Sequence, residues 1–242
     1  MRTAAVLLSA SIALAQPMLA RAEPKDETPQ ASAASNSYFP LATGARWLYT
    51  ERTGLFGRRK IEVTALGPRT VQGLDPGVGD LFVVREVGDR SFMGIDDEGV
   101  VGFRRDEEFW IRYSAIGEES TGELRLFGEE GVQMLPLDPQ PGQRWEQSSH
   151  LFQVPGSSGA VREWRGEVSR EGRMRVPAGV YEDVLKVTIE YRDPVASGGK
   201  PEITFEDYYA RNVGLIQTIT RNHAGGGWRK IVRTLTAYHE AE

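Results

Sequence analysis

The feature that most constrains this chain is the alternation of apolar and polar residues in short runs. In the segment 184–191 (VLKVTIEY), Leu185, Val187, Ile189 and Tyr191 are apolar, and the residues between them are polar. A period of two places alternate side chains on opposite faces of a strand, one buried and one in water. The 27 Gly and 13 Pro residues interrupt these runs too often for many helices to form. The sequence therefore predicts an all-β, mainly antiparallel fold with little helix, built as a curved sheet or half-barrel.

Residues 1–22 have the features of an export signal peptide. Arg2 gives a positive start, residues 4–15 are apolar, and Ala20-Arg21-Ala22 is a small-x-small cleavage site. This apolar run is shorter than the ~20 residues that a membrane span needs. The chain contains no Cys, so it has no lipobox cysteine for a lipid anchor. We expect an exported protein without a membrane span, soluble in the periplasm or secreted, whose mature chain begins at Glu23.

The rest of the chain divides by composition. Residues 23–37 (EPKDETPQASAASNS) contain no large apolar side chain and are predicted to form a disordered linker. Residues 38–242 have the length of a single β-rich domain. Whether this domain consists of two related halves, 38–133 and 134–242, is left open by the sequence.

The charge balance speaks against a polyanionic partner. Cleavage of the signal peptide removes Arg2 and Arg21 and no acidic residue, which leaves 27 basic and 34 acidic residues and a net charge of about −7. The basic residues are mostly isolated Arg between acids. Nucleic acids and anionic lipid surfaces are recognised by clustered Lys and Arg, so neither is expected as a partner.

Two stretches, residues 38–49 (YFPLATGARWLY) and 135–145 (LPLDPQPGQRW), share the outline Pro-Leu, a short loop, Gly, two residues and Trp. We interpret each as a turn that starts a strand and places a large ring in the core, since buried Trp is more common than Trp that stacks on a ligand. The predicted structural residues of this repeated motif are Pro40, Gly44, Trp47, Pro136, Gly142 and Trp145.

Two further turns are predicted in the second half of the domain. In Val176-Pro177-Ala178-Gly179, Pro177 fixes φ and Gly179 permits a left-handed backbone, as expected before a strand. Residues 208–216 (YYARNVGLI) read as strand, tight turn and strand, with Gly214 in a β-bulge.

These motifs resemble a group of uncharacterised exported bacterial proteins and lipoproteins. Residues 38–49, 174–187 (MRVPAGVYEDVLKV), 207–218 (DYYARNVGLIQT) and 235–238 (LTAY) occur in the same order as that group's Y-x-P-L-x-x-G-x-x-W-x-Y, V-P-A-G-x-[FY], Y-Y-A-x-x-V-G-L-[IV] and L-x-x-Y motifs. Some of its members are TapB-type proteins, and the set is similar to the half-barrels of periplasmic lipoprotein carriers. The resemblance implies a fold and no activity.

Catalytic and metal-binding signatures are weak throughout. The chain has no Cys, no G-x-S-x-G elbow, and only His150, His223 and His239, so a triad or a zinc site is not expected. Clusters of acids occur at 96–98, 106–108, 118–119 and 129–130, none with the spacing of a Ca²⁺ loop. No catalytic residue, metal ligand or cofactor is therefore predicted.

Aromatic residues are numerous enough to line a groove in a curled sheet, although filling a large core would also use them. They are Phe82, Phe92, Phe103, Phe109, Trp110, Tyr113, Phe127, Phe152, Trp164, Tyr191, Phe205 and Tyr209. The first hypothesis is an exported, non-enzymatic β-domain that binds an apolar small molecule, lipid or acyl chain in the cell envelope. The alternative is a structural module that docks on an envelope protein through strand edges. A carboxylate-dependent hydrolase is the weakest reading.

Overall fold

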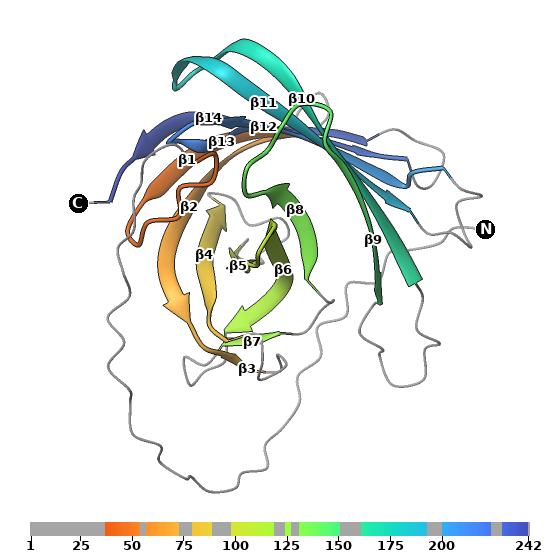
Figure 1. Cartoon of the computed structure of the whole chain (residues 1–242). Helices are drawn as coiled ribbons and strands as arrows, with labels where there is room; N and C mark the ends of the chain where they lie inside the picture. The colour runs from red at the N-terminus through yellow and green to blue at the C-terminus, as the bar shows by residue number, and fades with distance from the viewer. Residues whose placement is uncertain are drawn as a thin grey trace, which may run out of the picture. The chain divides into compact units, whose positions relative to one another are not determined.

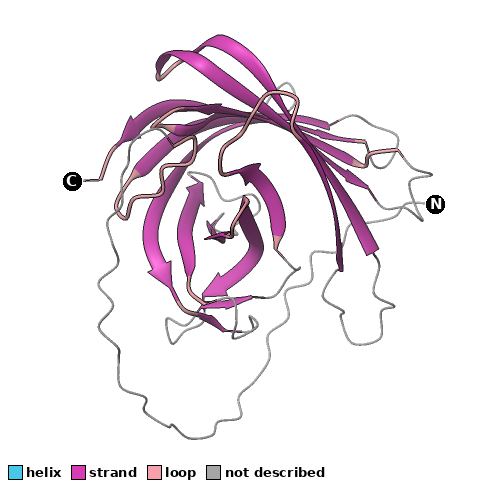
Figure 2. Cartoon of the chain, viewed as in Figure 1, coloured by secondary structure: helices cyan, strands magenta, loops and turns pink. Residues whose placement is uncertain are grey.

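The regular structure is entirely β-strand within the part of the chain that the computed structural model describes (Figure 2). That part comprises residues 37–53, 57–72, 79–88, 98–118, 124–126, 131–150, 161–192, 200–223 and 229–241. The all-β prediction is confirmed. The aromatic residues Phe92, Phe127 and Phe152, the predicted signal peptide and residues 23–36 of the predicted linker lie outside these residues. No helix in the described residues is long and apolar enough to cross a membrane.

The strands are β1 (Arg46–Thr53), β2 (Gly57–Arg69), β3 (Val71–Gln72), β4 (Leu81–Gly88), β5 (Glu98–Arg105), β6 (Phe109–Glu118), β7 (Leu124–Leu126), β8 (Val132–Pro136), β9 (Arg144–His150), β10 (Val161–Val176), β11 (Gly179–Arg192), β12 (Ile203–Ala210), β13 (Gly214–Asn222) and β14 (Arg229–His239). They form one 14-stranded sheet. Every pairing is antiparallel except that of the short strands β3 and β7, as the prediction of a mainly antiparallel sheet required.

The sheet consists of two meanders joined edge to edge. The first runs β1-β2-β4-β5-β6-β8, the second runs β9 to β14 in chain order, and β1 pairs with β14 between them. Figure 1 shows how strongly the sheet curls, so that β8 faces β9 across the remaining opening. The described strands therefore make a nearly closed, barrel-like sheet.

Side chains bridge the seam between β8 and β9, where no backbone ladder forms among the described residues. The Gln147 side chain accepts a hydrogen bond from the Gln133 N–H (2.8 Å) and donates one to the Gly131 carbonyl (2.7 Å). Trp145 Nε1 donates to the Gln133 carbonyl at 3.3 Å. The amide of Gln147 thus replaces a strand partner, which satisfies backbone groups that would otherwise form an open edge.

The first copy of the repeated motif forms a tight turn that leads into β1. The Ala45 N–H donates to the Ala42 carbonyl (3.0 Å), the Gly44 N–H to the Ala65 carbonyl (2.8 Å), and the Ala65 N–H to the Ala45 carbonyl (2.9 Å). Gly44 has φ +92°, at the position where a type II turn requires positive φ.

The second copy repeats the same three hydrogen bonds before β9. The Gln143 N–H donates to Gln140 (3.0 Å), the Gly142 N–H to Val168 (2.8 Å), and the Val168 N–H to Gln143 (2.9 Å). Gly142 also has φ +92°. The two meanders therefore begin with the same turn, the same strand contact and a buried Trp three residues after the Gly.

The turn at Pro177 and Ala178 ends a long hairpin, β10–β11, and β11 begins at Gly179 with φ +154°. The hairpin arches over β13 and β14 (Figure 1), and the Ala178 N–H donates to the Leu235 carbonyl at 3.2 Å. Apolar side chains of the hairpin pack with those of β13 and β14. The buried residues of this layer include Val176, Val184, Ile216 and Leu235.

Candidate functional site

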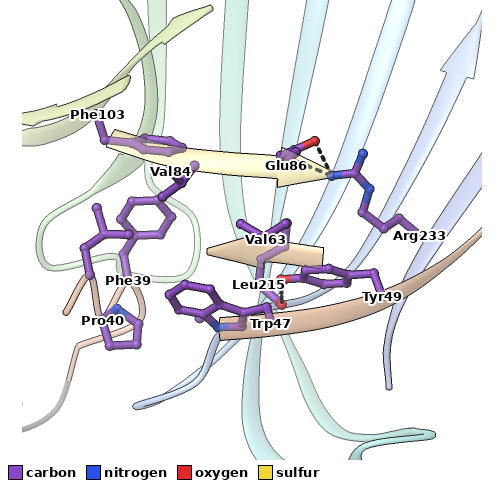
Figure 3. Close-up of a pocket in the computed structure, with 12 residues that line it drawn as sticks. Phe39, Pro40, Trp47, Tyr49, Val63, Val84, Glu86, Phe103, Leu215 and Arg233 are labelled. Carbon is purple, nitrogen blue, oxygen red and sulfur yellow. Dashed lines mark hydrogen bonds and ion pairs between the residues drawn. The ribbon is translucent and has the colours of Figure 1, made fainter. Parts of the chain in front are cut away.

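A partly open, mainly apolar cavity of about 80 Å³ lies inside the curled sheet. Trp47 and Tyr49 of β1 and Val84 of β4 contribute to one side of its lining (Figure 3). Residues 39–41, which precede β1, contribute the other side. We call Ser37–Leu41 the strap.

The strap belongs to no strand and is held at its start by a small polar cluster. The Asn212 N–H donates to the Ser37 carbonyl at 2.8 Å. The Tyr38 hydroxyl donates to the Asp183 carbonyl and to its carboxylate, both at 3.1 Å. The guanidinium carbon of Arg211 lies 4.4 Å from the Tyr38 ring centroid. Arg211 Nε donates a hydrogen bond to the Asp183 carboxylate at 3.2 Å. We call these contacts the latch.

Asp183 is the centre of the latch. Hydrogen bonds from Arg211 and Tyr38 hold the pKa of its carboxyl below the ordinary value, and Arg170 forms an ion pair with it at 3.0 Å. Asp183 also has φ +54°, a left-handed conformation that few non-Gly residues adopt. The carboxylate is thus ionised and fixed in place where it receives the Tyr38 hydroxyl.

Phe39 lies at the inner end of the strap among three other rings. Its centroid is 4.9 Å from that of Phe103, 5.1 Å from that of Trp110 and 6.4 Å from that of Tyr209. These distances and the tilted or edge-on geometries are those of favourable aromatic pairs. Pro40 follows and packs close to Gly214, where an added Cβ would stand 3.3 Å from Pro40 Cδ.

A wide, open groove of about 800 Å³ lies on the other side of Phe103. Phe82, Phe103 and Trp110 give it an aromatic lining, and Arg104 and Arg105 are accompanied by three acids. Phe103 lines both the groove and the cavity, while Phe39 lines the cavity and contacts Trp110 of the groove. The cavity and the more open groove therefore share Phe103, and Phe39 contacts rings of both.

Charged residues close one end of the cavity as a paired network. Arg233 donates to both carboxylate oxygens of Glu86 (3.0 and 3.1 Å) and to Glu51 at 3.2 Å, and Arg59 donates to Glu51 at 2.8 Å. Burial alone would lower the pKa of Arg233, but the two carboxylates outweigh it and raise that pKa. Tyr49 donates to the Leu215 carbonyl at 2.8 Å, and burial raises its pKa. Arg233 therefore bridges Glu51 and Glu86, so that both carboxylates are paired with one guanidinium.

Asp207 on β12 is a buried carboxyl that the sequence analysis did not single out. It is 6% exposed, and burial raises its pKa to about 6. It accepts side-chain hydrogen bonds from Thr218 and Tyr209, and the charges of Arg112 and Arg233 partly offset the effect of burial. Its Oδ1 has no hydrogen-bond partner. The signal was available, because Asp207 occupies the same alternate positions as the apolar Phe205 and Tyr209.

The predicted structural residues fall into two groups. Pro40, Trp47 and Gly214 line the cavity. Trp47 also stacks on Tyr238 (5.5 Å between centroids) and donates from Nε1 to the Val213 carbonyl at 2.7 Å. Gly44 does not line the cavity itself, but its turn leads into β1, which carries Trp47. The residues that do not line the cavity are Pro136, Gly142, Trp145, Pro177 and Gly179.

Gly214 does not form the predicted bulge. It pairs with Ala210 as the first residue of β13, and the irregularity lies further along, where Tyr208 pairs with Gln217 and Tyr209 with Leu215. The positive φ of Gly214 (+89°) instead follows the tight turn, and its missing side chain leaves room for Pro40.

Trp145 is buried far from the cavity lining, against the Phe109 ring at 5.4 Å and directly over Gly166. A Cβ at Gly166 would stand 2.0 Å from the Trp145 ring. Gly inside a strand often marks such a close approach, a signal that was present in the sequence.

The three His residues, the only ones in the sequence, lie apart from one another along the chain. His223 Nε2 lies 3.2 Å from Thr204 Oγ1, and His239 is exposed at the end of β14. The side chain of His150 lies outside the described part. Among the side chains that are described, no three His, Asp or Glu residues are grouped so as to hold a metal ion.

Comparisons with known proteins do not assign this chain to a family. No family model and no curated protein matches the chain. A predicted lipoprotein of Parabacteroides distasonis has a solved structure that is 14% identical, with a TM-score of 0.49 over 84% of this chain and 99% of that one. A predicted exported protein with a YmcC-like fold from Bacteroides fragilis is also 14% identical, with a TM-score of 0.48 over 85% of this chain and 100% of that one. At these values neither structure carries an argument about what this chain binds.

Proposed function

We propose that this protein is an exported, non-enzymatic binding protein of the cell envelope that takes an apolar ligand, such as an acyl chain, along the groove and into the cavity. The observation that carries the proposal is that Phe103 lines both spaces, the groove together with Trp110 and the cavity together with Trp47. Rings on both sides of one shared wall offer an apolar chain a lined path from solvent to the interior.

The cavity and the groove differ in volume, and we therefore expect them to hold different parts of the ligand. A cavity of about 80 Å³ is smaller than the ~300–1,000 Å³ of pockets that hold drug-sized ligands. The groove, at about 800 Å³, lies within that range. The body of the ligand therefore lies in the groove, and only its apolar end reaches the cavity.

The surface supports a ligand in the groove over a partner on an apolar face. Among the described side chains, the large hydrophobic residues classed as exposed are Val87 (40%) and Val180 (39%), and these belong to different strands. Stable docking faces usually present a contiguous apolar patch. The β8 side of the seam is also occupied, since Gln147 and Trp145 take up the backbone groups of Gly131 and Gln133. Docking through strand edges is therefore the less supported alternative.

Quenching of Trp fluorescence by a brominated long-chain fatty acid tests the proposal. Trp47 lines the cavity and Trp110 the groove, so a bound brominated chain should quench both. Val84→Phe should weaken saturable binding, because Val84 lines the cavity that takes the end of the ligand and the larger ring extends into it. Val87→Phe makes the same change on the same strand at an exposed position and should bind like the wild type.

Two results would contradict the proposal. The first is an absence of saturable quenching in the wild type with both the fatty acid and a brominated long-chain alcohol. The second is equal binding by Val84→Phe and the wild type, provided that the variant retains its cooperative unfolding transition. A difference in affinity between the fatty acid and the alcohol would show that the head group contributes to binding, and it would not contradict an apolar site for the chain.

A further inference from the structure

We infer that Phe39 occupies the socket into which the end of the apolar ligand binds, so that the strap and the ligand compete for one place. This inference rests on the proposed function, because it assigns a resident occupant to the same site. The socket is formed by Phe103, Trp110 and Tyr209, all within 6.4 Å of the Phe39 centroid.

The position of Phe39 is what divides the site. Its ring lines the cavity and touches Trp110, which lines the groove. Withdrawing that ring leaves a ring-sized space between the two volumes, lined by aromatic side chains. Apolar spaces of this kind stay dry and take up apolar molecules. The joined space is larger than the cavity alone, so the apolar end of the ligand can reach further into the interior.

The strap can leave without breaking the sheet. It lies before β1, outside every strand ladder of the described residues, and its nearest backbone bonds are Leu41 N–H to Phe39 C=O (3.1 Å) and Asn212 N–H to Ser37 C=O (2.8 Å). The other contacts of the strap are made by side chains: the Tyr38 hydroxyl donates to Asp183, the Tyr38 ring is buried at 5% exposure, and Phe39 packs against its three neighbouring rings. An apolar ligand that takes the place of Phe39 would replace its ring contacts, so that opening costs mainly the polar contacts of the latch and the burial of Tyr38.

The latch variant Tyr38→Phe tests the competition with the smallest change to the protein. It removes the hydroxyl that donates to Asp183 and leaves the ring under Arg211. Weakening the closed state raises the fraction of protein that can bind, and the apparent affinity rises with that fraction. Loss of one such bond should tighten binding of the brominated fatty acid about threefold to tenfold. Tyr181→Phe removes a hydroxyl on the same hairpin as Asp183 and is the matched control, for which no change is expected.

Phe39→Ala gives the second arm. It empties the socket and should bind the fatty acid more tightly than the wild type, and should also bind toluene, which is of the size of the deleted side chain. The competition would be overturned if Phe39→Ala bound the fatty acid no more tightly than the wild type and Tyr38→Phe bound it equally. If the wild type still bound the fatty acid, the proposed function would stand. Absence of binding in the wild type and in both variants would overturn the proposed function itself.

Discussion

Replacing Asp207 by Asn tests how the interior of this fold holds a buried carboxyl. The group is 6% exposed and its pKa in the folded protein is about 6, against an ordinary value of 3.8. Burial opposes ionisation more strongly than Arg112, Arg233 and the donors Thr218 and Tyr209 favour it. An Asn side chain has nearly the same shape, still accepts from both donors, and carries no charge to bury.

The magnitude follows from the displacement of the pKa. A difference of about 2 units between folded and unfolded states corresponds to roughly 3 kcal/mol at 1.36 kcal/mol per unit. Because the folded pKa lies above the unfolded one, the contribution of Asp207 to stability is fully present below about pH 3.8 and is lost as the pH rises through about 6. The stability of Asp207→Asn relative to the wild type should therefore increase by about 3 kcal/mol between pH 3.5 and pH 7.5.

Urea unfolding followed by Trp fluorescence gives this quantity at each pH. Other carboxylates titrate in the same range, so the informative value is the difference between variant and wild type at matched pH, with equal m-values as the condition for comparing them. Asp183→Asn serves as a contrast, because the pKa of that carboxyl is lowered and its difference should change with the opposite sign. A difference for Asp207→Asn that stays constant across pH, or falls at neutral pH, would show that the arginines rather than burial control the group.

The remaining predictions concern the two Trp residues and the seam. Trp47→Ala and Trp145→Ala should each lower the free energy of unfolding by ~3–5 kcal/mol, measured by denaturant unfolding; unchanged midpoints would refute their role as core side chains. Gly166→Ala should cost ~1–3 kcal/mol because its Cβ meets the Trp145 ring, and a wild-type melting temperature would contradict that contact. Gln147→Leu should lose ~1–3 kcal/mol and speed hydrogen exchange at the Gln133 amide; unchanged protection of that amide would show that the seam does not depend on this side chain.

Local sequence signals predicted the strands and the turns of this fold. The alternation at Leu185, Val187 and Ile189 predicted one buried strand face, and these three side chains are buried. Such patterns report on neighbours within a few residues. The pairing of β1 with β14, which are far apart in the chain, depends on how the two meanders close, and no local periodicity encodes it.

The site was harder to foresee because its parts come from distant segments. Trp47 was identified as a core ring, but the role of Phe39 depends on Asp183 and Asn212, more than a hundred residues away. Glu51 sits at a buried alternate position, so the sequence hinted at an inward charge. Its partner Arg233 lies at the other end of the domain, and only the curl of the sheet brings the two together.

Native mass spectrometry of protein isolated from its native source shows directly whether the cavity and groove hold an apolar ligand. We expect the wild-type chain, measured under gentle ionisation, to carry an added mass in the range of an acyl-chain lipid. The added mass should be less abundant in Val84→Phe, which narrows the cavity, than in Val87→Phe, which alters the surface of the same strand. A ligand-free mass for the wild type, or equal abundance of the added mass in both variants, would contradict the proposed function.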